Sequence, residues 1–318
     1  MRLAIAGAGA VGSSVAQLAG DYGHRVTAVA DSSSAAIDPD GLDVDAVLER
    51  KDSEGAVGTA DPGDALETDY DVLVEATPTT LGDAQPGFGH LQRALQRDRH
   101  VVLANKGPVA ERYGEVMALA EDSAGEVRFE ATVGGAIPVL STIEDYGPET
   151  ITAARGVLNG TANFILSRMA AEGLDYEHVL AEAQDLGVAE ADPSFDVEGT
   201  DAALKCVILA NVLSDGREYT LEDATVEGIE AIPPSALELA RGDGRTIRLI
   251  GEVAGGEIRV GPRLVPEQAD LAPSGTRNIV QLETENAGRL NLSGRGAGGP
   301  ETATAVLSDI NRLTRAVP

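Results

Sequence analysis

The sequence opens with R-L-A-I-A-G-A-G-A-V-G (Arg2–Gly12), which joins a short apolar run to a glycine-rich turn. The apolar run 2–6 predicts a buried strand, and the residues after the turn predict a helix that extends to about Ala19. A strand, a glycine turn and a helix in this order are typical of the first unit of a doubly wound α/β domain. The rest of the chain is interpreted outward from this unit.

The glycines of the turn have the G-x-G-x-x-G spacing at Gly7, Gly9 and Gly12. In this motif the glycines permit a tight bend, the close approach of a pyrophosphate and close helix packing, while the start of the helix, here Ala10 and Val11, presents N–H groups to the phosphates. The spacing alone is weak evidence, since a chain with 37 glycines could carry a purely structural turn. The strand before it and the helix after it favour dinucleotide binding.

A second strand at 25–30 ends in Asp31. A carboxylate at this point of such a domain accepts hydrogen bonds from the adenosine ribose, so Asp31 favours NAD as the cofactor. Arg50 and Lys51 could still reach the 2′-phosphate of NADP. The sequence therefore predicts NAD or NADP and leaves the choice open.

Strands and helices continue to alternate through the first part of the chain, which predicts a Rossmann-like, doubly wound parallel sheet. Thr77 and Lys106 each follow a predicted strand, at the edge where ligands of such sheets bind. Lys106 could be an ordinary loop lysine, but the chain has three lysines against 21 arginines, so each one is informative. The expected elements are strands at 71–76, 100–104 and 126–131 and helices at 87–97 and 108–121.

The pattern changes from Thr132, where a glycine-rich link predicts the start of a second α/β domain. We expect a dinucleotide-binding domain at 1–131, a dimerisation and catalytic domain at 132–299, and a C-terminal helix, 300–318, that returns to the first domain. Gly296 lies in G-R-G-A-G-G (294–299), which could close over the cofactor or only pack on the first domain. Within the second domain we expect strands near 152–158, 245–254, 257–265 and 276–283 and helices near 160–172, 175–186 and 233–241.

One stretch of the second domain carries most of its charged candidates: A-Q-D-L-G-V-A-E-A-D-P-S-F-D-V-E-G-T-D-A-A-L-K (Ala183–Lys205). The Asp-Pro break predicts an irregular loop over 187–198, followed by a helix after Gly199. Asp201 and Lys205 then lie four residues apart on one helix face. They could form a surface ion pair of about 0.3–0.5 kcal/mol, or a buried functional pair, since an apolar run follows the lysine.

Composition restricts the classes of function. The formal net charge of −28 excludes a nucleic-acid partner and predicts a fold that needs salt to screen its self-repulsion, as in a halophile. No apolar run is long enough for a membrane helix, and the start of the chain predicts no secretory signal. The one cysteine, Cys206, fits a reducing cytoplasm.

The motifs together resemble those of the homoserine dehydrogenase family. The resemblance covers nearly the whole chain and implies a Rossmann-like domain, a dimerisation segment and an α/β catalytic region, with a homodimer as the assembly. It leaves no room for an aspartate kinase fusion or a C-terminal regulatory domain. The matching sequences are the signature positions Ala183, Gly187, Asp192-Pro193, Asp196, Gly199, Asp201 and Lys205, with E-A-T-V-G-G-A-I-P, A-N-K-G-P, N-G-T-A-N-F-I-L and G-A-G-G-P-E-T-A-T-A-V-L-S-D.

By this resemblance the chain would transfer a hydride reversibly between L-aspartate 4-semialdehyde and L-homoserine. Lys205 would be the acid/base, and Lys106 would hold or polarise the same oxygen. The substrate would be bound by Glu190, Asp196, Asp201, Gly160 and Thr161, and backbone carbonyls of Glu130, Val133, Gly135 and Ile137 would hold a monovalent cation, Na⁺ or K⁺.

Val188 departs from the family, which often has an aromatic residue there, so substrate affinity is the property in doubt. Two other functions are weighed. One is a related NAD(P)-dependent dehydrogenase of amino-acid or sugar metabolism, and the other is a non-catalytic dinucleotide-sensing protein. A non-catalytic protein would be expected to lose these groups, so the joint presence of Lys106, Glu190, Asp201 and Lys205 argues against it.

Overall fold

A computed structural model describes residues 1–315 of the chain. The chain divides into two compact units, one formed by Met1–Ala136 together with the chain from Ala297 onward, and one formed by Ile137–Gly296. Among the described residues, none of the helices combines the length and the apolar character that crossing a bilayer requires.

The first unit is built on a six-stranded sheet in which every neighbouring pair is parallel except β3 with β2. Its four central strands, β1, β2, β4 and β5, are buried along almost their whole length because helices cover both faces of such a sheet, as the apolar run of β1 predicts. The Rossmann-like prediction is confirmed. In spatial order the strands are β3 (Ala35–Ile37), β2 (Arg25–Ala30), β1 (Arg2–Ala6), β4 (Val72–Glu75), β5 (His100–Leu103) and β6 (Val127–Arg128).

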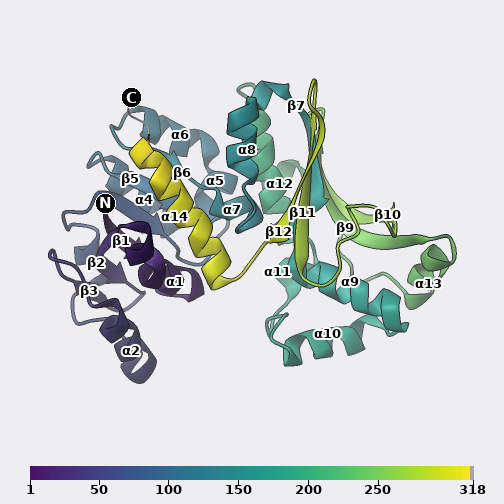
Figure 1. Cartoon of the computed structure of the whole chain (residues 1–318), viewed down its shortest axis with the longest axis horizontal. Helices are drawn as coiled ribbons and strands as arrows, with labels where there is room; N and C mark the ends of the chain where they lie inside the picture. The colour runs from purple at the N-terminus through teal and green to yellow at the C-terminus, as the bar shows by residue number, and fades with distance from the viewer. Residues whose placement is uncertain (316–318) are drawn as a thin grey trace. The chain divides into compact units, whose positions relative to one another are not determined.

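Helix α14 (Gly299–Arg315) packs along α1 (Ala10–Leu18), as Figure 1 shows. Its buried residues recur at helical spacing and join the core of the sheet: Ala303, Val306, Leu307, Ile310 and Leu313. A side chain at Gly299 would meet Ala10 O at 2.7 Å, so a glycine lets the two helices approach closely.

The other helices of this unit are η1 (Ala19–Tyr22), α2 (Val44–Glu54), α3 (Pro62–Ala65), α4 (Gly87–Leu95), α5 (Gly107–Glu111), α6 (Tyr113–Glu121) and α7 (Ala131–Gly134). The single helix expected at 108–121 is wrong, because the chain leaves helical geometry at Arg112 (φ −139°, ψ 37°). There the guanidinium lies 3.4 Å from the Phe88 ring centre and bonds to Glu115.

The second unit contains a mainly antiparallel sheet whose only parallel pair among the described strands is β8 with β10. Helices α9 and α12 pack on it (Figure 1). At Gly251 of β9 a side chain would lie 2.5 Å from Cys206 Sγ of α12, so this glycine permits close helix–sheet packing. In spatial order the strands are β12 (Gly288–Arg295), β11 (Arg277–Thr284), β7 (Ile151–Val157), β9 (Arg245–Ala254), β10 (Glu257–Pro266) and β8 (Ala224–Val226).

Helix α12 is buried on all sides from Asp201 to Asn211 and forms the centre of this unit. The loop expected at 187–198 contains one helical turn, α11, because Asp192 accepts bonds from the backbone and hydroxyl of Ser194 and so opens a turn. The helices are α8 (Val139–Tyr146), η2 (Pro148–Thr150), α9 (Gly160–Glu172), α10 (Tyr176–Asp185), α11 (Ser194–Val197), α12 (Thr200–Leu213), η3 (Leu221–Asp223) and α13 (Pro234–Gly242).

Candidate active site

The three glycines of the turn from β1 into the first residues of α1 are present for different reasons. Gly7 has φ +100°, and a side chain there would lie 2.4 Å from Ala76 O, while a side chain at Gly12 would lie 1.8 Å from Gly7 O. The fold itself therefore requires both glycines. Gly9 is exposed, has φ −76°, and would place a side chain in open space, with nothing within 4 Å. The open space beside Gly9 is what a dinucleotide pyrophosphate at the start of α1 needs, so the turn fits the cofactor.

Asp31 follows β2 and is fixed by the turn after it. Its Oδ1 accepts from the backbone N–H groups of Ser33 and Ser34, both at 2.8 Å, and from both hydroxyls. Partial burial opposes the charge of this carboxylate, but these hydrogen bonds outweigh it and lower the pKa of Asp31. All four bonds go to Oδ1, so Oδ2 of a fixed, ionised carboxylate is the oxygen suited to a ribose hydroxyl.

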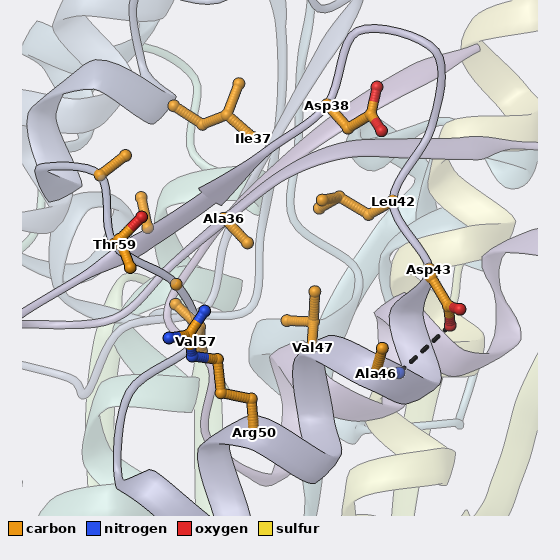
Figure 2. A pocket seen from close by; sticks show the side chains of 13 residues that line it. Ala36, Ile37, Asp38, Leu42, Asp43, Ala46, Val47, Arg50, Val57 and Thr59 are labelled. Carbon is orange, nitrogen blue, oxygen red and sulfur yellow. Dashed lines mark hydrogen bonds between the residues drawn. The ribbon is translucent and has the colours of Figure 1, made fainter.

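A pocket of about 410 Å³ lies between α2, β3 and residues 57–60 (Figure 2). It adjoins the Asp31 turn, since Ser34 Oγ accepts from Val57 N, and Val57 lines the pocket. Arg50 points into it beside Val57, with its Nε donating to Glu54 at 2.9 Å. Of the two cations considered for a 2′-phosphate, Arg50 lines the pocket and Lys51 does not.

The carboxyl ends of β4 and β5 meet in a buried polar network that the sequence did not predict. Glu75, which is fully buried, accepts from Thr77 N at 3.0 Å and from the Thr77 hydroxyl, and pairs with His90 Nδ1 at 2.7 Å. The Asn105 amide donates to Glu75 and to Thr77, at 3.4 and 3.2 Å. This network fixes the two loops that carry the candidates Thr77 and Lys106, and Lys106 directly precedes α5.

In the second unit, Lys205 and Asp201 form a buried pair on α12. Lys205 Nζ donates to Asp201 Oδ2 and to Leu158 O, both at 2.6 Å. The two side chains are only 8% and 9% exposed, so the surface ion pair is the wrong interpretation. An ammonium has three N–H donors. Two of them hold Lys205 in place, and the third is available to a substrate oxygen.

Asn159 connects this pair to a second carboxylate. Its amide donates to Asp196 Oδ1 at 2.6 Å and to Asp201 Oδ2 at 3.0 Å. Its own oxygen caps α9 by accepting from Ala162 N at 2.8 Å. The structure thus brings Lys205, Asp201 and Asp196 into one network around Asn159, which was not among the site residues predicted from the sequence.

The remaining substrate candidates lie around this network without joining its bonds. Gly160 and Thr161 open α9, and the Thr161 hydroxyl donates to Val188 O at 3.1 Å. Glu190 is exposed, and Gln184 binds its backbone carbonyl rather than its carboxylate. An N-terminal helix turn attracts anions, which suits a substrate carboxylate at Gly160 and Thr161.

The candidate cation ligands lie in two different units. In the first unit Glu130 and Gly135 flank α7 and Val133 lies within it, and Ile137 begins the second unit. Glu130 N donates to Asp309 Oδ2 at 2.8 Å, and burial raises the pKa of Asp309 to about 7. The described chain contains no cluster of three His, Cys, Asp or Glu side chains suited to a metal. A site made of backbone carbonyls stays a prediction.

Gly296, the last cofactor candidate, packs against Asn278, since a side chain there would lie 2.0 Å from Asn278 Nδ2. Asn278 was not among the residues predicted from the sequence. It is 2% exposed and donates to the same Leu158 O that binds Lys205, at 2.9 Å.

Comparison with protein families gives two matches. The profile of homoserine dehydrogenase matches residues 138–311, and that of glutamate/leucine/phenylalanine/valine dehydrogenase matches residues 1–80. A homoserine dehydrogenase of Methanocaldococcus jannaschii is 42% identical over 98% of this chain and 97% of its own. An NAD(+)-dependent homoserine dehydrogenase of Pseudomonas canavaninivorans is 36% identical over 97% and 95% of the two chains.

Solved structures agree in fold along the whole chain. A putative homoserine dehydrogenase from Archaeoglobus fulgidus has a TM-score of 0.90 at 42% identity, covering 98% of this chain and 99% of that one. A hyperthermophilic archaeal homoserine dehydrogenase in complex with NADPH has a TM-score of 0.86 at 29% identity, covering 100% and 98%.

Proposed function

The chain belongs to the homoserine dehydrogenase family, and from this we propose that Lys205, held by Asp201 and Leu158 O, is the residue that moves the proton. The reaction is the reversible, NAD(P)-dependent interconversion of L-homoserine and L-aspartate 4-semialdehyde. Bound NAD(P) accepts the hydride in one direction and supplies it in the other.

The single observation that carries the proposal is the buried Lys205 with two of its N–H groups already engaged. In the oxidation of homoserine, neutral Lys205 takes the hydroxyl proton while the C–H bond of the same carbon gives up its hydride and the carbonyl forms. In the reverse direction the ammonium returns this proton to the carbonyl oxygen. Asp201 stabilises the ammonium that forms. Asp201 and Leu158 O together fix the direction in which the third N–H of this ammonium points.

We infer that the carboxylates around Asn159 bind the substrate ammonium together with Glu190. Asp196 is tied to the network by Asn159, and Glu190 is exposed, so both are open to the role that the family resemblance gives them. The N-terminal turn of α9, at Gly160 and Thr161, supplies backbone donors for the substrate carboxylate. In this proposal the second unit, Ile137–Gly296, binds the substrate, and the first unit binds the dinucleotide.

Lys106 is proposed as the second lysine of the reaction. What supports it is its place after β5, beside the Glu75 network that holds Thr77. We further infer that Gly9, the start of α1, Asp31 and Gly296 contact the dinucleotide. A monovalent cation would be held by the backbone carbonyls of Glu130, Val133, Gly135 and Ile137.

The test is Lys205→Ala, with Lys106→Ala in parallel, assayed at 340 nm with homoserine and with NAD or NADP in high salt. Loss of a general acid/base costs about 10²- to 10⁴-fold in turnover, so Lys205→Ala should fall by at least this factor. NADH affinity, measured by fluorescence titration, should stay near that of the wild type. Turnover within tenfold of the wild type, or a large loss of NADH affinity, would overturn the assignment.

The same assay compares the two cofactors. Asp31 supports a preference for NAD, and Arg50 in the adjoining pocket supports acceptance of NADP. An absorbance that stays constant with both cofactors, in a folded sample, would favour the non-catalytic alternative.

A cytoplasmic location and a homodimer are also inferred from the family. Support for the dimer comes from β12, an edge strand with one paired neighbour among the described strands and with half-buried Leu290 and Leu292. Light scattering at assay salt concentration tests it, and a monomer mass would contradict it.

A further inference from the structure

A second amide lies on the carbonyl that holds Lys205. Leu158 O accepts from Lys205 Nζ at 2.6 Å and from Asn278 Nδ2 at 2.9 Å. Asn278, in β11, is 120 residues away from Leu158 in sequence and is 2% exposed. A carbonyl oxygen has two lone pairs, so these two donors saturate it.

We propose that Asn278 is a positioning residue for proton transfer, which holds Leu158 O in place and thereby fixes the direction of the third N–H of Lys205. This inference rests on the proposed role of Lys205. With both lone pairs of Leu158 O in use, water has no acceptor there with which to compete, and the ammonium has one defined position between Leu158 O and Asp201.

The orientation of the Asn278 amide is set by its surroundings. Rotating the amide by half a turn would place Oδ1 against Leu158 O, two acceptors without a proton between them. Gly296 packs against the amide from another side, since a methyl group added at Gly296 would lie 2.0 Å from Asn278 Nδ2 and 2.3 Å from Asn278 Cγ. The amide is therefore closely packed on the side of Gly296.

Only the donor side of the Asn278 amide is bonded within the described chain. Asn278 Oδ1 is buried and has no hydrogen-bond partner within residues 1–315. The asparagine is explained if the donor at Nδ2 is what the site needs.

Two variants test the proposal in different ways. Asn278→Ala removes the donor, and we expect kcat to fall about tenfold to a hundredfold, the range expected when a reacting group is displaced by about an ångström, with KM for homoserine and NADH affinity within about twofold. Asn278→Asp also removes the donor, since a carboxylate sets an acceptor against Leu158 O in either orientation, and it adds a negative charge near the Lys205 ammonium. Asp201 already bonds to this ammonium, and Asn159 links Asp196 to Asp201. An added negative charge favours the protonated amine, so the pH of half-maximal homoserine oxidation should move upward.

Asn163 of α9 provides a matched control. It is fully buried, its amide donates to Pro273 O, to Gly275 O and, at 3.5 Å, to the carbonyl of Arg277, the residue before Asn278, and its Oδ1 also lacks a partner among the described residues. Asn163→Ala therefore removes a comparable buried amide without touching Leu158 O. It should lower the melting temperature as much as Asn278→Ala does but leave the pH profile in place.

The outcomes separate the possible failures. If Asn278→Asp gives the wild-type pH profile, or if Asn278→Ala and Asn163→Ala reduce kcat alike, Asn278 is only structural and the inference is wrong. If Asn278→Ala does not fold, the aspartate variant, which keeps the shape of the side chain, decides alone. Lys205→Ala in the same series separates a failure of this inference from a failure of the proposed function, because retained turnover in that variant would refute the role of Lys205 itself.

Discussion

Gly9→Ala is expected to leave the fold intact and to weaken the binding of the cofactor. Gly9 has φ −76° and ψ −167°, which alanine adopts freely, and the new methyl group would have no protein atom within 4 Å. Replacing glycine by alanine in a compatible conformation stabilises a protein by about 0.4–1 kcal/mol, because the unfolded chain loses freedom. The melting temperature should therefore stay the same or rise slightly.

The affinity for the cofactor should fall, although the melting temperature does not. If the pyrophosphate lies against Gly9, the methyl group overfills a packed contact, and overpacking costs about 1–3 kcal/mol. Since about 1.4 kcal/mol is a factor of ten in Kd, the Kd for NADH should rise about fivefold to 150-fold. A fluorescence titration with NADH and a thermal melt in the same buffer measure both quantities.

Two glycines of the same segment serve as controls. Gly20 is exposed, and a side chain there would also have nothing within 4 Å, so Gly20→Ala should change neither quantity by much. A methyl at Gly12 would lie 1.8 Å from Gly7 O, so Gly12→Ala should destabilise the unit itself. A folded Gly9→Ala protein with wild-type Kd would refute the placement of the pyrophosphate at this turn.

Two further predictions concern the second unit and the surface. Asn159→Asp keeps an acceptor for Ala162 N but sets a buried carboxylate against Asp196 and Asp201, so both the melting temperature and homoserine turnover should fall, turnover by more than about tenfold. Asn159→Ala should lose the donor and about 1 kcal/mol of capping without this repulsion. Turnover near that of the wild type in the aspartate variant would show that these bonds are incidental. The net charge of −28 predicts that the melting temperature rises from dilute to molar KCl, as the screening length falls from about 10 Å to about 3 Å, and equal stability at both concentrations would contradict salt adaptation.

The central parts of the fold could be predicted because local sequence determines them. Strands β1, β2, β4 and β5 are short, mainly apolar runs that are buried, and a glycine turn follows the first of them. Elements at the margins were missed. Helix α2 has no buried residue, so it shows no apolar stripe, and β12 alternates leucine with exposed polar residues at a sheet edge. Their positions depend on partners that local patterns do not show.

The candidate site was predictable where charge and helical spacing coincide. Asp201 and Lys205 are four residues apart on a helix, and their pairing follows from the spacing alone. Leu158 O could not be found in this way, because a backbone carbonyl has no signature in the sequence. The Glu75–His90 and Asn278–Leu158 contacts join residues 15 and 120 positions apart, so they appear only when the strands are assembled.

The end of β7 explains why the amides matter as much as the charged groups. Leu158 and Asn159 follow this strand directly, and their polar groups serve opposite functions: the carbonyl accepts from the acid/base candidate, and the next side chain donates to both carboxylates. The same Asn159 caps α9, whose first turn is the proposed carboxylate subsite. Because one strand end positions the lysine, its carboxylate partner and the helix start, these groups cannot shift independently. A substitution that moves this strand end should therefore impair proton transfer and substrate binding together, whereas one at Asn278, whose amide bonds only to the carbonyl, should impair proton transfer alone.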